Sequence, residues 1–201
     1  MKAARFALAV ARPRAFCPDK VLDAARGAFE AHGYEATSVQ NLVDATGLSR
    51  SSLYAAFGDK HRLYLAALDR YGQDRGAERA CAFADAATPL DGIRLYLDAV
   101  AAGRGCFAVA AAAERAGTDP DTAARAVQGW TASVATFADA LRRAQATGHL
   151  PAHRDADALG ATLAATVYGL RGMQSAGADA EACRTVARTA FEALVDAGRG
   201  A

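Results

Sequence analysis

The chain has 201 residues, enough to bury one or two hydrophobic cores, and its net charge is only +1. Aromatic residues make up 7% of the chain and alanine is abundant, which favours closely packed helices; no convincing run of alternating β-branched residues predicts a sheet. The longest apolar stretch, residues 158–170, is shorter than the roughly 20 residues that cross a bilayer. We therefore expect a cytoplasmic protein without a membrane partner.

The excess of positive charge lies at the N-terminal end, where residues 1–62 hold nine Lys or Arg against six acids. Residues 1–17 form a basic arm with no acid before Asp19, which suits contact with phosphates or the minor groove. A solvated, disordered tail is the alternative interpretation. The short apolar run in this arm is flanked by arginines, which argues against a signal peptide. The basic residues of the arm are Lys2, Arg5, Arg12 and Arg14.

Two short helices joined by a glycine turn are predicted between Thr37 and Lys60. Thr37 and Gln40 have the spacing of a capping box, which places a helix start at Thr37. Gly47 can take the left-handed conformation that ends this helix, and Ser49 can cap the next one. Two short helices around such a turn are typical of the helix-turn-helix, whose second helix enters the major groove, although they also occur in ordinary bundles.

The segment from Lys20 to Tyr71 resembles the DNA-binding domain of the TetR family of bacterial transcriptional regulators along its whole length. It departs from the family pattern at Val43 and Thr46, where alanine is usual, and at Ala55-Ala56, where many members carry a polar side chain that contacts DNA. The matching residues are Ala24-Ala25, Phe29, Gly33-Tyr34, Thr37, Val39, Gly47-Leu48-Ser49, Leu53-Tyr54, Phe57, Lys60 and Leu63.

The resemblance implies an all-α protein, with a three-helix DNA-binding domain over residues 18–62 and a helical effector-binding and dimerisation domain over residues 63–201. Arg50, Ser51 and Tyr54 are expected on the groove face of the recognition helix, with Arg50 as the best reader of a base. The full set of expected DNA contacts is Thr37, Ser38, Ser49, Arg50, Ser51, Ser52, Tyr54 and Lys60.

Beyond Lys60, caps and breaks divide the chain into further helices, for a total of about nine. Proline at the first helical position follows a capping residue at Thr88-Pro89 and again at Asp119-Pro120. The expected helices start at Asp59, at Thr88-Pro89, at Cys106 (to about Ala116), at Asp119-Pro120, at Asp155 (to Met173) and at Ala178 (to Ala197).

The central helices carry aromatic residues that fit an apolar pocket for a small-molecule inducer, although ordinary core packing explains each residue singly. Cys106 follows Arg104-Gly105, and a thiol at a helix N-terminus beside an arginine favours the reactive thiolate. This position resembles that of a sensing cysteine in one branch of the family, but free cysteines are often buried and inert. The expected ligand-binding residues are Tyr96, Cys106, Phe107, Trp130, Phe137 and Tyr168.

The last two helices carry small residues on their faces, for example Gly160, Ala164 and Gly169 in one and Ala187 and Ala190 in the other. The resemblance implies that this pair forms a four-helix bundle with its twin, and so a homodimer; packing within one chain is the alternative. Two recognition helices about 34 Å apart would match successive major grooves of operator DNA.

No residue spacing points to catalysis, because neither His-Glu-x-x-His nor a nucleophile elbow is present. The four cysteines lie far apart, without the paired spacing of a zinc site, and we expect no cofactor or metal. The sequence thus predicts a transcriptional regulator, in particular a repressor released from its operator by a small molecule or a thiol-reactive compound. A helical adaptor with vestigial DNA binding, and a small helical enzyme, are the alternatives.

Overall fold

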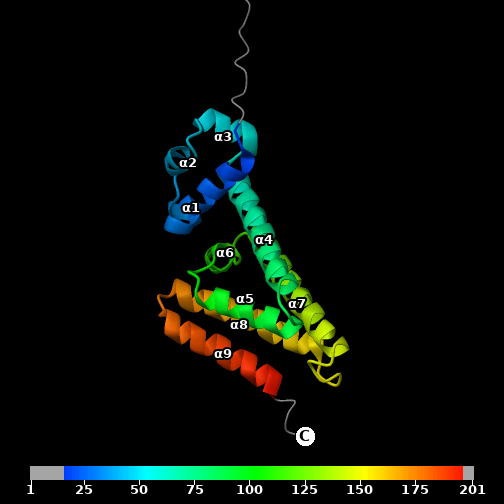
Figure 1. Cartoon of the computed structure of the whole chain (residues 1–201). Coiled ribbons are helices and arrows are strands. Elements are labelled where there is room, and N and C mark those ends of the chain that lie inside the picture. The colour runs from blue at the N-terminus through cyan, green and yellow to red at the C-terminus, as the bar shows by residue number, and fades with distance from the viewer. Residues whose placement is uncertain (1–15, 197–201) are drawn as a thin grey trace, which may run out of the picture.

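The computed structural model describes residues 16–196, which form nine helices and no strand (Figure 1). This confirms the all-α prediction. Residues 1–15 of the basic arm, which carry its four cationic side chains, lie outside the described residues. The helices are α1 (Pro18–Ala36), α2 (Val39–Thr46), α3 (Arg50–Phe57), α4 (Lys60–Ala84), α5 (Pro89–Ala101), α6 (Phe107–Arg115), α7 (Pro120–Ala146), α8 (Ala156–Ser175) and α9 (Ala180–Asp196).

The cap of α2 differs from the sequence prediction. Ser38, not Thr37, is the N-cap: its hydroxyl accepts the N–H of Asn41, and the Asn41 side chain accepts the N–H of Ser38. Serine and asparagine complete a capping box in the same way as the more usual threonine and glutamine. The turn after α2 is as predicted, with Gly47 left-handed at φ 68°.

Side chains cap most of the other predicted helix starts, although Cys106 at the start of α6 makes no side-chain cap hydrogen bond. Ser49 accepts the N–H of Ser52 at the start of α3, and Asp59 accepts that of Arg62 at the start of α4. Capping oxygens also open α5, α7 and α8, from Thr88, Asp119 and Asp155. These caps satisfy backbone donors that no helical carbonyl can reach, and they fix where each helix begins.

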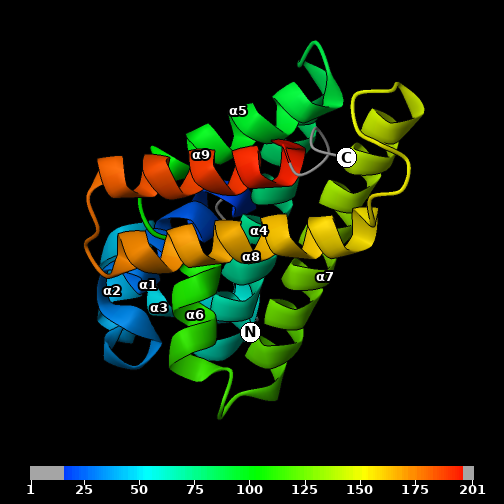
Figure 2. The same ribbon diagram turned by 90° about the horizontal axis from the view of Figure 1, so that it is seen from below.

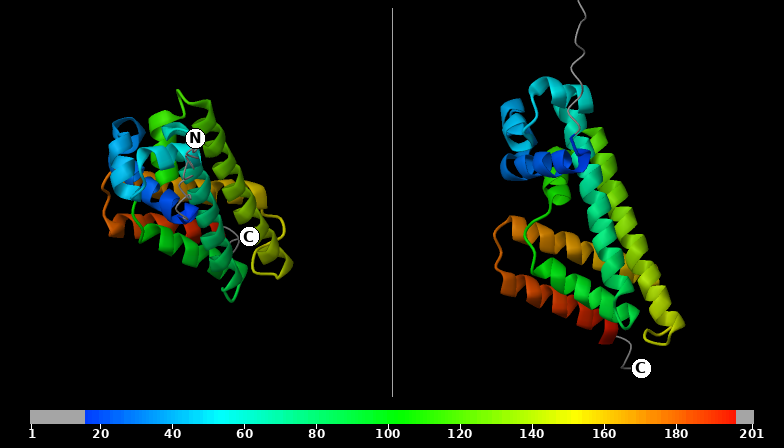
Figure 3. Two further views of the ribbon diagram at one scale, coloured as in Figure 1. Left: turned by 90° about the horizontal axis from the view of Figure 1, so that it is seen from above. Right: turned by 45° about the horizontal axis from the view of Figure 1, so that its top comes forward.

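Two hydrophobic cores hold the helices together. One core joins α1, α2 and α3 to the first half of α4, and it also takes in Phe107 and Ala111 of α6. The other joins α5, α7, α8 and α9 to the end of α4. Helix α4 therefore belongs to both cores, and it runs from α3 down to α5 with α7 beside it (Figures 1 and 3).

Helices α8 and α9 lie at the end of the molecule farthest from α3, where they cross the near face in Figure 2. Part of their small-residue surface packs inside the chain: Gly160 lies against α7, because an added Cβ would stand 2.9 Å from the backbone nitrogen of Ala138. Ala164 and Ala187 are also fully buried. The opposite side of α8, including Ala165 and Gly169, is exposed. In the described part of the chain, no helix is long and apolar enough to cross a membrane.

Candidate DNA interface and effector cavity

Helix α3 presents a polar face at the end of the molecule. Leu53, which is 2% exposed, and the half-buried Phe57 fix the inner side of the helix to the N-terminal core. Arg50 and Ser51 point outward and are exposed. The Arg50 guanidinium lies 5.5 Å from the centre of the Tyr54 ring, so the two side chains share one surface. Such a face can enter a groove while the buried side stays on the core.

The serines around the turn are mostly engaged with one another. The Ser49 hydroxyl lies 3.0 Å from that of Ser51 and 2.9 Å from that of Ser52. Ser38 is exposed at the start of α2, where its hydroxyl serves the capping box. These hydroxyls mark the N-termini of α2 and α3, and helix N-termini favour phosphate oxygens.

Thr37 does not belong to this surface. Its side chain is fully buried, and its hydroxyl donates to the carbonyl of Gly33 at 2.5 Å and lies 3.3 Å from that of Ala28. The expectation of a phosphate contact through this hydroxyl is therefore corrected. Thr37 instead closes the end of α1, where Gly33 interrupts the helix with φ 75°.

Lys60, the first residue of α4, is half-buried beside α1. Its ammonium lies 4.3 Å from the centre of the Tyr34 ring and 3.4 Å from the Glu35 carbonyl oxygen. Burial lowers the pKa of Lys60 from its ordinary value, and the nearby carboxylate of Glu35 opposes this effect. A lysine at this place joins the start of α4 to the end of α1, shortly after α3 ends at Phe57.

A polar junction connects this region to α6. The Glu114 carboxylate accepts the N–H groups of Tyr34 at 2.9 Å and Glu35 at 3.1 Å. The Arg115 guanidinium lies 3.8 Å from the centre of the Tyr34 ring and pairs with the carboxylates of Glu35 and Asp119. The C-terminal end of α6 is thus fastened to the last residues of α1, just after Gly33.

Asp119 extends the junction to α4, because its carboxylate lies 2.8 Å from Nε2 of His61. Asp119 also accepts from the Thr122 hydroxyl at 2.7 Å while it caps α7. Burial alone would raise the pKa of Asp119, but the hydrogen bonds from His61 and Thr122 outweigh it and hold this pKa well below its ordinary value.

A cavity of about 150 Å³ lies among α4, α5, α6, α7 and α8. Its walls combine apolar and aromatic side chains with a few polar groups, the composition of a ligand site. Apart from three tyrosines, the polar lining residues are Cys106, Ser133 and three arginines, Arg75, Arg79 and Arg171. No lining residue is acidic.

Three of the six residues expected in a ligand pocket line this cavity, namely Tyr96, Cys106 and Tyr168. The other three do not. Phe107 packs in the N-terminal core, its ring 5.7 Å from that of Tyr64. Phe137 is fully buried against other core rings, and Trp130 is 36% exposed, with its ring edge-on to Tyr168. Aromatic character alone does not separate core from cavity wall.

Cys106 lies half-buried in the cavity wall and is the N-cap residue of α6. The Tyr71 hydroxyl donates to its sulfur at 3.2 Å. Burial and the neighbouring Cys106 raise the pKa of Tyr71, so this phenol stays protonated and able to donate. Of the other cysteines, Cys17 and Cys81 are exposed and Cys183 is buried in the second core.

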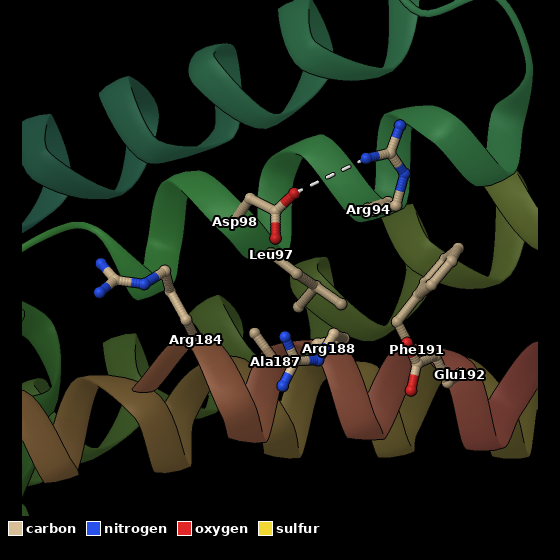
Figure 4. Close-up of a pocket in the computed structure, with 8 residues that line it drawn as sticks. All are labelled: Arg94, Leu97, Asp98, Arg184, Ala187, Arg188, Phe191 and Glu192. Atoms are coloured by element: carbon tan, nitrogen blue, oxygen red, sulfur yellow. Dashed lines mark ion pairs between the residues drawn. The ribbon is translucent and has the colours of Figure 1, made fainter. Parts of the chain in front are cut away.

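A second hollow, of about 330 Å³, lies between α5 and α9 (Figure 4). Its walls include Leu97 and Phe191, and its rim carries charges of both signs. Arg94 on this rim pairs with Asp98 at 3.9 Å, and both side chains are about half exposed. Because the charged groups on its rim are exposed to solvent or paired with each other, this hollow does not indicate a particular class of ligand.

Sequence reasoning missed Arg79 and Arg171 in the cavity, and Glu114 and Arg115 at the junction. A signal existed for Arg79, which continues the buried row of α4 that includes Tyr71 and Phe83. An arginine in an apolar row is unusual enough to mark a site. The partners of Glu114 are backbone amides 79 and 80 residues away, and no local pattern reveals them.

Comparison with known proteins agrees with this geometry. Residues 21–67 match the family model described as bacterial regulatory proteins, tetR family. Residues 90–190 match the model of the tetracyclin repressor-like C-terminal domain. The HTH-type transcriptional repressor ComR of Escherichia coli (strain K12) is 32% identical over 187 residues, which are 89% of each chain.

A solved structure of the TetR family transcriptional regulator CifR, a cysteine mutant complexed with double-strand operator DNA, superposes with a TM-score of 0.79 at 31% identity. The match covers 90% of this chain and 99% of that one. The repressor BdcR of Escherichia coli (strain K12) is 42% identical over 60 residues, 30% of each chain. Together with the exposed recognition helix, these matches show that the chain belongs to the TetR family of bacterial transcriptional regulators.

Proposed function

We propose that this regulator is a repressor that binds a near-palindromic operator as a homodimer and is released by a small molecule in the cavity among α4 to α8. The observation that carries the proposal is the exposed polar face of α3, fixed to the core by Leu53 and Phe57. Support comes from the relative ComR, which is a transcriptional repressor, and from CifR, which binds operator DNA.

A row of small residues on the outer side of α8 favours the homodimer. Ala158, Thr162, Ala165 and Gly169 are exposed and recur at helical spacing on one face. Val186 of the neighbouring α9 is 39% exposed, although it is a large apolar residue. A two-fold partner would cover these residues by close helix packing and would place two copies of α3 on one side of the DNA.

The cavity has a short route to the DNA-binding surface. Cys106 at the start of α6 lies in the cavity wall, and Glu114 and Arg115 at its other end hold the Tyr34 segment. A ligand that prefers one position of α6 would bias the orientation of α2 and α3 through these contacts. A thiol-reactive inducer acting at Cys106 is a second candidate, because Tyr71 donates to its sulfur within the cavity.

DNA binding is tested by gel shift with the purified chain and the DNA upstream of its own gene, where such regulators often bind. Arg50→Ala should weaken binding of the DNA fragment that wild type binds most tightly by about 1–3 kcal/mol, and it should relax specificity at one base pair. Arg142→Ala, which changes an exposed arginine far from α3 along the chain, is the matched control. If no fragment is bound specifically, the repressor proposal fails and an adaptor role becomes the better explanation.

Dimerisation is tested by analytical ultracentrifugation of Ala165→Arg. A long charged side chain on the outer face of α8 should convert the dimer to monomer, because it would have to be buried without a partner. Ala77→Arg, at an exposed position of α4, should leave the dimer intact. A dimer that survives the Ala165 substitution at low micromolar concentration would place the interface elsewhere.

A further inference from the structure

We propose that the ligand of the cavity among α4 to α8 is a small organic acid, whose carboxylate pairs with Arg79 and Arg171 and whose apolar part packs on the aromatic wall. This inference rests on the proposed role of the cavity as the effector site, and it adds the chemical class of the effector. It is drawn from the charge and burial of the cavity residues.

Arg79 is a buried cation, and the described part of the chain gives it no counter-ion. Its side chain is only 7% exposed, and its guanidinium lies 5.8 Å and 6.0 Å from the ring centres of Tyr96 and Phe137. One terminal nitrogen donates to the Ser133 hydroxyl at 3.1 Å, while the buried Nε has no hydrogen-bond partner. Among the described side chains of residues 16–194, no carboxylate lies within ion-pair distance of this guanidinium.

Arg171 of α8 also lines the cavity and is 8% exposed. Its Nη1 lies 3.3 Å from each of two neutral acceptors, the Gly105 carbonyl and the Gln174 side-chain oxygen. The loop before α6 gives the guanidinium room, because a Cβ at Gly103 would stand only 2.6 Å from Nη1. The described part of the chain offers this arginine no acidic partner either.

Two buried arginines facing one cavity are unfavourable in the absence of an anion. Desolvation of an unpaired charge costs several kcal/mol, and neutral acceptors offset only part of this. Three arginines that are more accessible behave differently: Arg70, Arg125 and Arg142 each pair with an aspartate. The third cavity arginine, Arg75, has Glu78 as its partner outside the lining. The positive charge of the cavity is therefore concentrated at Arg79 and Arg171.

A carboxylate would supply the negatively charged acceptor that the two guanidinium groups lack, because its oxygens can accept charge-assisted hydrogen bonds from both. Tyr96 and Tyr168 also line the cavity, and their phenol groups can act as further donors. The volume of about 150 Å³ suits a ligand of single-ring size, since an apolar cavity of about 150 Å³ binds benzene.

The experiment measures binding to the full chain, free of DNA, by titration calorimetry and thermal shift. The probes are benzoate, trans-cinnamate and hexanoate, each compared with its amide, which has nearly the same shape and no charge. At least one acid should bind with one site per chain and raise Tm, and its amide should bind at least tenfold more weakly. Arg79→Met and Arg171→Met should each weaken that acid at least tenfold, whereas Arg142→Met should bind it as wild type does.

A second measurement needs no ligand. Because Arg79 is buried and has no acidic partner among the described residues, Arg79→Met should melt at the same temperature as wild type or higher. A Tm lower by several degrees would show that this arginine stabilises the fold, and would overturn the proposal. Failure of all three acids to bind, or equal binding of acid and amide, would also overturn it. Operator binding by the same samples in a gel shift tests the repressor proposal separately, so the two can fail independently.

Discussion

Gly160 sets the distance between α7 and α8, and its replacement by alanine should destabilise the protein. An added Cβ would lie 2.9 Å from the Ala138 nitrogen, 3.0 Å from the Val134 carbonyl oxygen and 3.1 Å from the Ala138 Cβ. Two of these atoms belong to the backbone of a long helix, so they cannot move aside individually. The two helices would have to separate, and overpacking of this kind costs about 1–3 kcal/mol.

A matched substitution isolates this steric cost. Gly27→Ala makes the same chemical change inside α1, at an exposed position where an added Cβ meets no atom within 4 Å. It should stabilise the chain by about 0.5–1 kcal/mol, because alanine restricts the unfolded backbone more than glycine does. The helix-propensity gain is similar in both variants and cancels when they are compared. Gly160→Ala should therefore be less stable than Gly27→Ala by about 1–3 kcal/mol.

Chemical denaturation at one fixed protein concentration gives the free energy of unfolding of both variants, since the stability of a dimer depends on concentration. The same variants should separate in thermal melts by roughly 2–4 °C per kcal/mol, as expected for a chain of this size. If the two variants proved equally stable, α7 and α8 would not be held at the distance that the structure shows.

Three further outcomes are expected. If the Lys60 ammonium reaches a phosphate, Lys60→Ala should reduce the slope of log K against log salt concentration for operator binding by about one unit in magnitude. An unchanged slope in titrations with KCl would indicate that this ammonium stays on the Tyr34 ring in the complex. N-ethylmaleimide should release operator DNA from wild type and from Cys17→Ser but not from Cys106→Ser, with the adduct mapped by mass spectrometry. Release from all three proteins would show that the Cys106 thiol is not needed for induction. The lowered pKa of Asp119 means that its carboxylate stabilises the fold above the unfolded pKa of about 3.9, and this contribution is lost as the pH falls through the lower folded-state pKa. Melts of Asp119→Asn should thus show a weaker fall in Tm below about pH 4 than those of wild type, and parallel curves would contradict this.

Most of the fold could be predicted from the sequence because its signals are local. Thr88-Pro89 and Asp119-Pro120 mark helix starts, and Gly47 marks a turn, through interactions within a few residues. The one misplaced cap shows the limit of such signals: Thr37 and Ser38 both carry a suitable hydroxyl. The choice between them depended on the carbonyls of α1 that engage Thr37 from the preceding helix.

The cavity was harder to predict because its walls come from five helices. Phe107 and Tyr96 look equivalent in the sequence, yet one fills the N-terminal core and the other faces the cavity. Which of the two roles an aromatic residue takes depends on how α5 and α6 turn relative to α4, and no residue spacing encodes that rotation. The arginines of the cavity gave a stronger signal. A charged residue among the apolar residues of a buried helix face is unusual, whereas an aromatic residue there is not.

The shared core of the N-terminal half has a practical consequence for protein engineering. Phe107 and Ala111 of α6 complete the core formed by α1 to α4, with Phe107 stacked 6.5 Å from Phe29. A fragment cut after α4 would leave Phe29 and Tyr64 facing water on the side that α6 covers, and would invite aggregation. A hybrid regulator that carries the DNA-binding helices of this chain on another sensor therefore has to bring the inner face of α6 with them, or replace it with matched apolar residues.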